Sequence, residues 1–324
     1  ITNVQQVTLG RSELRSSRLV YGCMRIAGDG GSADRDRGKR AIHAALEAGY
    51  TQFDHADIYG DGACESLFGE VLQENPGLRD ELLITSKCGI RKAGQPEADD
   101  PKRYDFSYQY LVDSVEGSLE RLGVDTLDLL LLHRPDYLFN AAEVATALET
   151  LHENGRVRHF GVSNFRTSQV KLLQSQCPWP LLVNQVEINL HNIDALDNGV
   201  LDQCQRRKIT PQAWSPLGGV AFEAWSNTFT PEDEARIRTE LEHQAEDPIV
   251  DIGHTAHIGH PHHQGPDLPD FGQPGDAPER TDSQGGFPAV IEVAVSPDLS
   301  PDRVSACVVS GGPGHRQQRM VSAG

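Results

Sequence analysis

The chain is short of positive charge. Its 324 residues carry 47 Asp and Glu against 29 Lys and Arg, which gives a formal net charge of −18. Nucleic acids and anionic lipid surfaces attract proteins through a positive field, so we expect neither as a partner of the surface as a whole. Apolar runs are also short, and none approaches the roughly 20 residues of a membrane-spanning helix. We therefore expect no membrane span.

Paired cysteines and rigid metal-ligand patterns are missing as well. The sequence contains no CxxC pair, and its six cysteines are scattered at positions 23, 64, 88, 177, 204 and 307. Such cysteines are typical of reduced thiols in a cytoplasmic protein. Five histidines lie in a Gly/Pro-rich run, at 254, 257, 260, 262 and 263. Zinc needs three or four ligands held rigidly, which this run does not offer, so we predict no metal site.

Strand-like and helix-like segments alternate from about residue 18 to residue 216. Helical patterns, rather than tight hairpins, separate the strand-like runs, and repeated βα units of this kind predict a parallel sheet, either open or closed. No GxGxxG follows the first run, which removes the main support for a doubly wound dinucleotide-binding fold. The count therefore favours an α/β fold of the (β/α)8 TIM-barrel type, preceded by a short hairpin over 4–18. The seven runs are 19–23, 51–54, 82–86, 128–132, 157–162, 181–187 and 209–214.

The composition changes abruptly at Asp247. The last 78 residues hold 10 of the 19 prolines, 11 of the 31 glycines and no lysine. A closed barrel cannot omit a strand, because that exposes two sheet edges. Either Ala289–Val295 is a divergent eighth strand, or residues 247–324 are an out-of-frame translation of the segment that once closed the barrel. We divide the chain into a barrel, 1–246, and an atypical tail, 247–324.

Reactive side chains follow three of the strand-like runs. Asp54 ends the second run and Tyr59 comes five residues later, Lys87 directly follows the third, and His133 follows the fourth. Barrel enzymes carry their chemistry at the C-terminal ends of the strands, where we expect these four to meet. Taken singly, each has a structural interpretation as a cap, a surface charge or a packing residue, and Asp57 competes with Asp54 for its role.

The order and context of these residues resemble the aldo-keto reductase superfamily over residues 7–240. The Asp and Tyr stand in Gly-Tyr-Thr-Gln-Phe-Asp-His-Ala-Asp-Ile-Tyr-Gly, the Lys in Ile-Thr-Ser-Lys, and the His in Leu-Leu-His-Arg-Pro-Asp. Gly-Val-Ser-Asn-Phe, Asn-Gln-Val-Glu and Ala-Trp-Ser-Pro-Leu-Gly follow in the family order. The details are similar to a bacterial branch that includes the YdhF-type oxidoreductases.

The resemblance implies an NADPH-dependent reductase of aldehydes or ketones, without metal or flavin. Reducing a carbonyl by hydride places negative charge on oxygen, so an acid must donate a proton there. An ammonium beside a phenol stabilises the phenolate and lowers the pKa of the phenol. Tyr59 is the expected acid, with Lys87 tuning it and Asp54 orienting Lys87. His133 is expected to hydrogen-bond the substrate oxygen and polarise it.

The resemblance also implies a set of cofactor residues. Ser163, Asn164 and Gln185 supply donors and acceptors for the nicotinamide carboxamide, and Trp214 a flat face for its ring. Further expected contacts are Ser215, Leu217 and Gly218 at the pyrophosphate, Arg280 at the adenosine 2′-phosphate, and Gly22, Met24 and Arg25 in the cofactor and substrate cleft.

The sequence is compatible with a second function. A reductase-like barrel without turnover is suited to sensing the cofactor or to a regulatory role, and the tail favours such an impaired protein. The complete set of Asp54, Tyr59, Lys87 and His133 favours the enzyme. The sequence names neither the substrate nor the oligomeric state.

Overall fold

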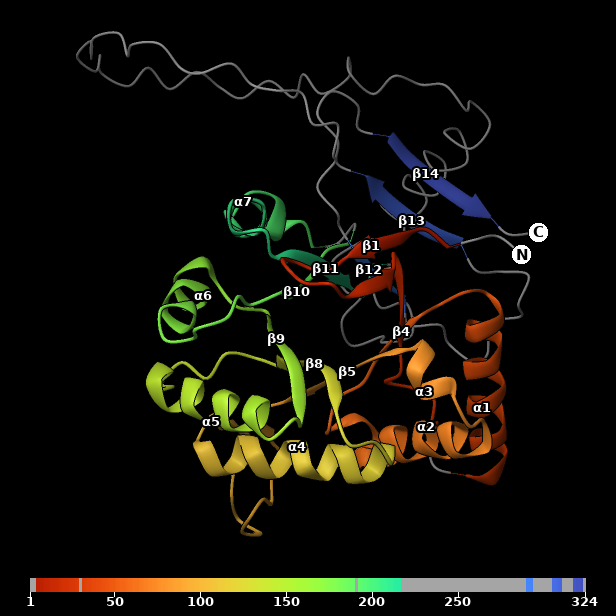
Figure 1. The fold of residues 1–324 in the computed structure, drawn as a ribbon, viewed down its shortest axis with the longest axis horizontal. Coiled ribbons are helices and arrows are strands. Elements are labelled where there is room, and N and C mark those ends of the chain that lie inside the picture. Colours follow the sequence, from red (N-terminus) through yellow and green to blue (C-terminus); the bar gives the residue numbers. More distant parts are fainter. Residues whose placement is uncertain are drawn as a thin grey trace, which may run out of the picture.

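The computed structural model describes residues 4–28, 31–189 and 192–216, together with the strands at 290–293, 305–310 and 317–322. Eight parallel strands close a barrel in the order β10-β11-β12-β3-β4-β5-β8-β9. Helices lie outside these strands, with α4 beside α5 (Figure 1). The predicted (β/α)8 barrel is therefore confirmed.

The barrel strands are short and lie between helices along the chain. They are β3 (Leu19–Gly22), β4 (Gln52–Asp54), β5 (Leu83–Cys88), β8 (Leu127–Leu132), β9 (Val157–Ser163), β10 (Val183–Glu187), β11 (Thr210–Trp214) and β12 (Val290–Val293). The helices are α1 (Ser32–Glu47), α2 (Ala63–Glu74), α3 (Leu78–Glu81), α4 (Tyr108–Leu122), α5 (Ala141–Glu153), α6 (Thr167–Gln174) and α7 (Val200–Arg207), with short 3-10 helices η1 (Tyr59–Gly62) and η2 (Asp194–Leu196).

One strand of the barrel comes from the tail. β12 pairs in parallel with β11 on one side and with β3 on the other, so it closes the barrel. It lies inside Ala289–Val295, the segment predicted as a divergent eighth strand. Residues 217–289, which contain the five histidines, lie outside the described residues.

Three small antiparallel pairs accompany the barrel. β1 (Gln6–Thr8) and β2 (Arg15–Ser17) form the predicted N-terminal hairpin. β6 (Ile90–Arg91) pairs with β7 (Arg103–Tyr104), which the sequence pattern did not reveal because each strand has only two residues. β13 (Ser305–Ser310) pairs with β14 (Gln317–Ser322).

Local sequence signals account for the helix ends. Asn140 caps α5, where its side chain accepts hydrogen bonds from the backbone N–H groups of Ala142 and Glu143. Gly123 ends α4 in the left-handed conformation (φ 65°), which glycine adopts without strain. Ser107 stands at the N-cap position of α4, but its hydroxyl donates to Asp105 instead of capping the helix.

A continuous apolar layer joins the strands to the helices. Its largest fully buried side chains include Phe53, Phe68 and Phe160. In the described part of the chain, no helix has the length and apolar character that a bilayer crossing requires. The core thus holds the strand ends in fixed positions, and those ends carry the chemistry.

Candidate active site

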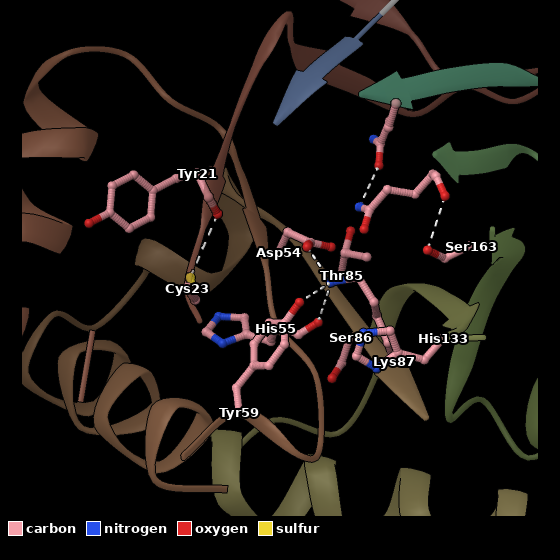
Figure 2. A network of polar contacts seen from close by, with 12 residues as sticks. Tyr21, Cys23, Asp54, His55, Tyr59, Thr85, Ser86, Lys87, His133 and Ser163 are labelled. Atoms are coloured by element: carbon pink, nitrogen blue, oxygen red, sulfur yellow. Dashed lines mark hydrogen bonds and ion pairs between the residues drawn. The ribbon is translucent and has the colours of Figure 1, made fainter. Parts of the chain in front are cut away.

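Four side chains meet at the C-terminal ends of β4, β5 and β8 (Figure 2). Asp54 is the last residue of β4, Lys87 is next to last in β5, and His133 directly follows β8. Tyr59 begins η1. The structure therefore brings together all four residues that the sequence predicted as catalytic.

Lys87 is the centre of this group. Its ammonium donates hydrogen bonds to a carboxylate oxygen of Asp54, to the backbone carbonyl of His55 at 3.0 Å and to the Tyr59 hydroxyl oxygen at 3.1 Å. Only 1% of Lys87 and none of Asp54 is exposed. An ammonium has three N–H donors, and each has a partner here. A buried ion pair is stable only when its remaining hydrogen bonds are satisfied in this way.

His133 packs edge-on against Tyr59, with ring centres 5.8 Å apart. Burial lowers the pKa of His133 well below its ordinary value, and the positive charges of Lys87, Arg134 and Lys102 lower it further. The imidazole is therefore neutral near neutral pH. A neutral imidazole can donate an N–H hydrogen bond, but it has no acidic proton to transfer.

The competition between Asp54 and Asp57 is decided by their positions. Asp54 binds the Lys87 ammonium, whereas the backbone N–H of Asp57 donates to the Lys87 carbonyl at 3.0 Å. Burial, and then the nearby charge of Glu65, raises the pKa of Asp57 to about 7. Asp54 is thus the partner of Lys87, as predicted.

A second buried cluster lies behind Lys87. Ser86 donates to Glu65 at 2.6 Å, and Arg121 donates to the other oxygen of Glu65 at 2.8 Å. Sequence reasoning missed this cluster, because Glu65 and Arg121 come from α2 and α4, far apart in the chain. A signal was present in Ser86, which directly precedes Lys87. The cluster fixes β5 against both helices next to the reactive lysine.

The residues predicted to hold the nicotinamide lie at the ends of β9, β10 and β11. The Asn164 amide donates to Ser163 at 2.8 Å, and Ser163 donates to the Gln185 backbone carbonyl at 3.0 Å. The Trp214 indole donates to the Asn164 carbonyl oxygen at 3.0 Å. These donors and acceptors fit a carboxamide, and the half-buried indole fits an aromatic ring beside it.

Arg134 adds a feature that the motif did not predict. Its guanidinium carbon lies 5.1 Å from the centre of the Trp214 ring, within the range of a cation–π contact. Arg134 follows β8 and Trp214 ends β11, with β9 and β10 between these strands in the barrel. The side chain therefore reaches across part of the barrel mouth.

The remaining predicted cofactor and cleft residues lie at or after the ends of β3 and β11 or outside the described residues. Gly22 ends β3 opposite Asp54, and Met24 and Arg25 follow in the next turn, both half-buried. Ser215 follows β11 with a left-handed backbone (φ 47°). Leu217, Gly218 and Arg280 lie outside the described residues.

Comparison with known proteins identifies this arrangement. The sequence matches the model of the Aldo/keto reductase family over residues 18–262. The chain belongs to the aldo/keto reductase family. It is 44% identical over 216 residues to the oxidoreductase YdhF of Escherichia coli, covering 67% of this chain and 72% of YdhF. It is 42% identical over 217 residues to a 6-dehydroglucose reductase of Agrobacterium fabrum, covering 67% and 72%.

Solved aldo-keto reductases share the fold. The thermostable aldo-keto reductase Tm1743, solved with the inhibitor epalrestat, aligns with a TM-score of 0.62 at 26% identity, over 75% of this chain and 81% of that one. The glycerol dehydrogenase AKR11B4 of Gluconobacter oxydans aligns with a TM-score of 0.58 at 30% identity, over 70% and 69%. As a member of this family, the chain is an oxidoreductase of small-molecule carbonyl chemistry that uses a nicotinamide cofactor.

Proposed function

We propose that this aldo/keto reductase is an NADPH-dependent reductase of aldehydes or ketones with Tyr59 as its general acid. One observation carries the proposal: the buried Lys87 ammonium donates to both Asp54 and Tyr59. The Tyr59 oxygen accepts from Lys87, and the phenol O–H is the group that would donate a proton to a carbonyl oxygen. The ammonium then stabilises the phenolate left after proton transfer.

The division of roles follows from charge. Lys87 is held in its charged form by Asp54, and all its protons are hydrogen-bonded, so it supports Tyr59 instead of donating to substrate. His133 is neutral, because burial and the cations around it lower its pKa. A hydrogen bond from its imidazole polarises the substrate carbonyl. Tyr59 is left as the proton donor.

The cofactor would be held by residues on the other side of the mouth. Ser163, Asn164 and Gln185 would bind the carboxamide and Trp214 would flank the ring, while Ser215 lies next toward the pyrophosphate. NADPH, when bound, supplies the hydride. The preference for NADPH over NADH is part of the proposal, as is the cytoplasmic location.

The experiment compares wild type with Tyr59→Phe, which removes one hydroxyl. Loss of a positioned acid lowers rates by about 10²- to 10⁴-fold. We expect a loss of that size in kcat for a reactive aldehyde, followed by the near-ultraviolet absorbance of NADPH, while fluorescence titration shows unchanged NADPH affinity. Near wild-type turnover in Tyr59→Phe would assign the acid elsewhere, and a wild type that binds NADPH but reduces no aldehyde or ketone would favour the sensor.

A further inference from the structure

The barrel mouth carries positive charge in a strongly acidic protein. Lys87, Arg134 and Lys102 all act electrostatically on His133, although the chain has a formal net charge of −18. Lys87 is neutralised by Asp54. Of the three cations that act on His133, Arg134 and Lys102 are the two that are not paired with Asp54.

Arg134 is built into this position. Its backbone connects His133 to the buried Pro135, and a residue before proline is restricted to extended conformations. Its half-buried side chain contacts the Trp214 ring, and the indole N–H of Trp214 is in turn fixed on Asn164. The Arg134 side chain is thus fixed at its backbone by Pro135 and at its guanidinium by the Trp214 ring.

The donors of Arg134 have no protein acceptor in the part of the chain that the structure describes. No ion pair or hydrogen bond joins its guanidinium to a side chain or carbonyl there, whereas Arg91, Arg121 and Arg158 each bind a carboxylate. A guanidinium is planar and carries its N–H donors around its edge. That edge suits the two oxygens of a carboxylate.

We propose that Arg134 is a specificity residue that binds an anionic substituent of the substrate, so that this enzyme prefers aldehydes or ketones bearing a carboxylate. The inference rests on the proposed reductase function, because it places the reacting carbonyl at Tyr59 and His133. Arg134 acts electrostatically on His133, so a substrate whose carbonyl lies at His133 would carry its anionic group within reach of Arg134. Lys102, which is exposed, adds attraction at longer range.

The test uses 3- and 4-carboxybenzaldehyde, each with its neutral methyl ester, and NADPH. We expect wild type to reduce at least one acid with a kcat/KM roughly tenfold or more above its ester, since a charge-assisted hydrogen bond contributes about 1.5–3 kcal/mol and 1.4 kcal/mol is tenfold. Arg134→Gln should lower kcat/KM for the acid, through KM, to about that of the ester, and the remaining reduction of both compounds shows that the variant folds. Arg134→Lys should keep part of it.

Arg166→Gln is the matched control. Arg166 is a second arginine near this end of the barrel, placed over the Tyr137 ring at 5.8 Å and not on Trp214. Removing its charge should leave the preference for the acid intact. An equal loss in both variants would mean general attraction and would overturn the specific pairing.

Titration calorimetry with the matching carboxylated alcohols and their esters separates this inference from the reductase proposal. Carboxylate binding that Arg134→Gln abolishes, without reduction of any aldehyde, would support the site and refute the reductase. Equal reduction of acid and ester by wild type would refute the site and leave the reductase standing. A variant that loses NADPH affinity alone would assign Arg134 to the cofactor and refute the inference.

Discussion

Lys87 shows how one residue combines stability and chemistry. Its charge is buried beside an equally buried carboxylate, a pairing that burial itself does not favour. Removing one partner of such a pair leaves an uncompensated charge and costs about 3–5 kcal/mol. Burying this pair nevertheless contributes little to the free energy of folding. The same ammonium also donates to Tyr59, where it can stabilise the phenolate.

We expect Lys87→Met to reduce activity as strongly as loss of Tyr59, because nothing then stabilises the phenolate. A pH–rate profile should show that the residual activity no longer follows the ionisation seen in wild type. Lys92→Met is the control, since Lys92 lies in the same region but pairs with the exposed Asp61. A Lys87→Met enzyme with an unchanged rate and profile would remove Lys87 from the mechanism.

His55 makes a residue-level prediction about pH. Its ring is fully buried, 4.7 Å from the Phe68 ring, and burial, followed by the charge of Lys87, lowers its pKa to about 3. In the unfolded chain a histidine titrates near 6.5. Between these two values the unfolded state binds a proton that the native state does not, so stability falls as pH falls.

Replacing His55 by Phe removes this contribution. In urea unfolding between about pH 4 and pH 6, we expect the free energy of unfolding of wild type to lose about 1.4 kcal/mol per pH unit more than that of His55→Phe. Asp57, whose pKa is raised to about 7, acts in the opposite direction in both proteins and cancels in the comparison. Parallel curves would show that His55 accepts a proton in the folded state.

At the scale of elements, α2 and α4 pack closely through a glycine. A Cβ on Gly69 of α2 would lie 2.6 Å from the Arg121 backbone oxygen of α4, a distance that only a shift of the helices can relieve. A Cβ on Gly117, inside α4, would meet only the end of the Arg121 side chain, at 3.0 Å. Side-chain ends can move, whereas backbone cannot.

These two glycines give opposite predictions for the same substitution. Gly69→Ala should lower the melting temperature, because α2 must move away from α4 and loosens the Glu65–Arg121 contact. Gly117→Ala should raise the free energy of unfolding by up to about 1 kcal/mol, the helix preference of Ala over Gly. Thermal unfolding of both variants, read by circular dichroism, tests the pair. A stabilised Gly69→Ala protein would contradict the close packing.

At the scale of the whole molecule, closure depends on one four-residue strand. β12 is the partner of both β3 and β11, the first and seventh strands of the barrel. Without it, two sheet edges would be exposed, and exposed edges promote association. The strands β13 and β14 pair only with each other among the described strands.

Two truncations test this arrangement. Deleting residues 247–324 should lower the urea midpoint and produce oligomers in size-exclusion chromatography. Deleting only 305–324 should change both far less. Equal stability of wild type and the longer deletion would show that β12 adds nothing to the barrel.

The out-of-frame origin of the tail stays a separate prediction. Reading the coding DNA beyond codon 246 in its other two frames should restore an apolar strand, followed by a Gly-Ser and a Glu-Arg pair. If neither frame does, the tail is the natural sequence, and Ala289–Val295 is its divergent eighth strand.

The sequence by itself determined the positions of the seven strands and of the side chains at their ends. Hydrophobic periodicity placed seven strands and the helices between them, because side-chain burial repeats with the period of each element. Asp54, Lys87 and His133 each stand at or beside the end of such a strand. Parallel strands bring those ends to one face, which is why the four residues predicted as catalytic lie together in the structure.

Only the tertiary structure decided the contacts between distant segments. Local spacing treats Asp54 and Asp57 alike, but in the barrel it is Asp54 that pairs with the Lys87 ammonium. Arg134 meets Trp214 across the mouth although 80 positions separate them in the chain. β12 closes the barrel despite a surrounding composition that gave little sign of it. Such contacts depend on strand order and register, which are set by the packing of the whole barrel.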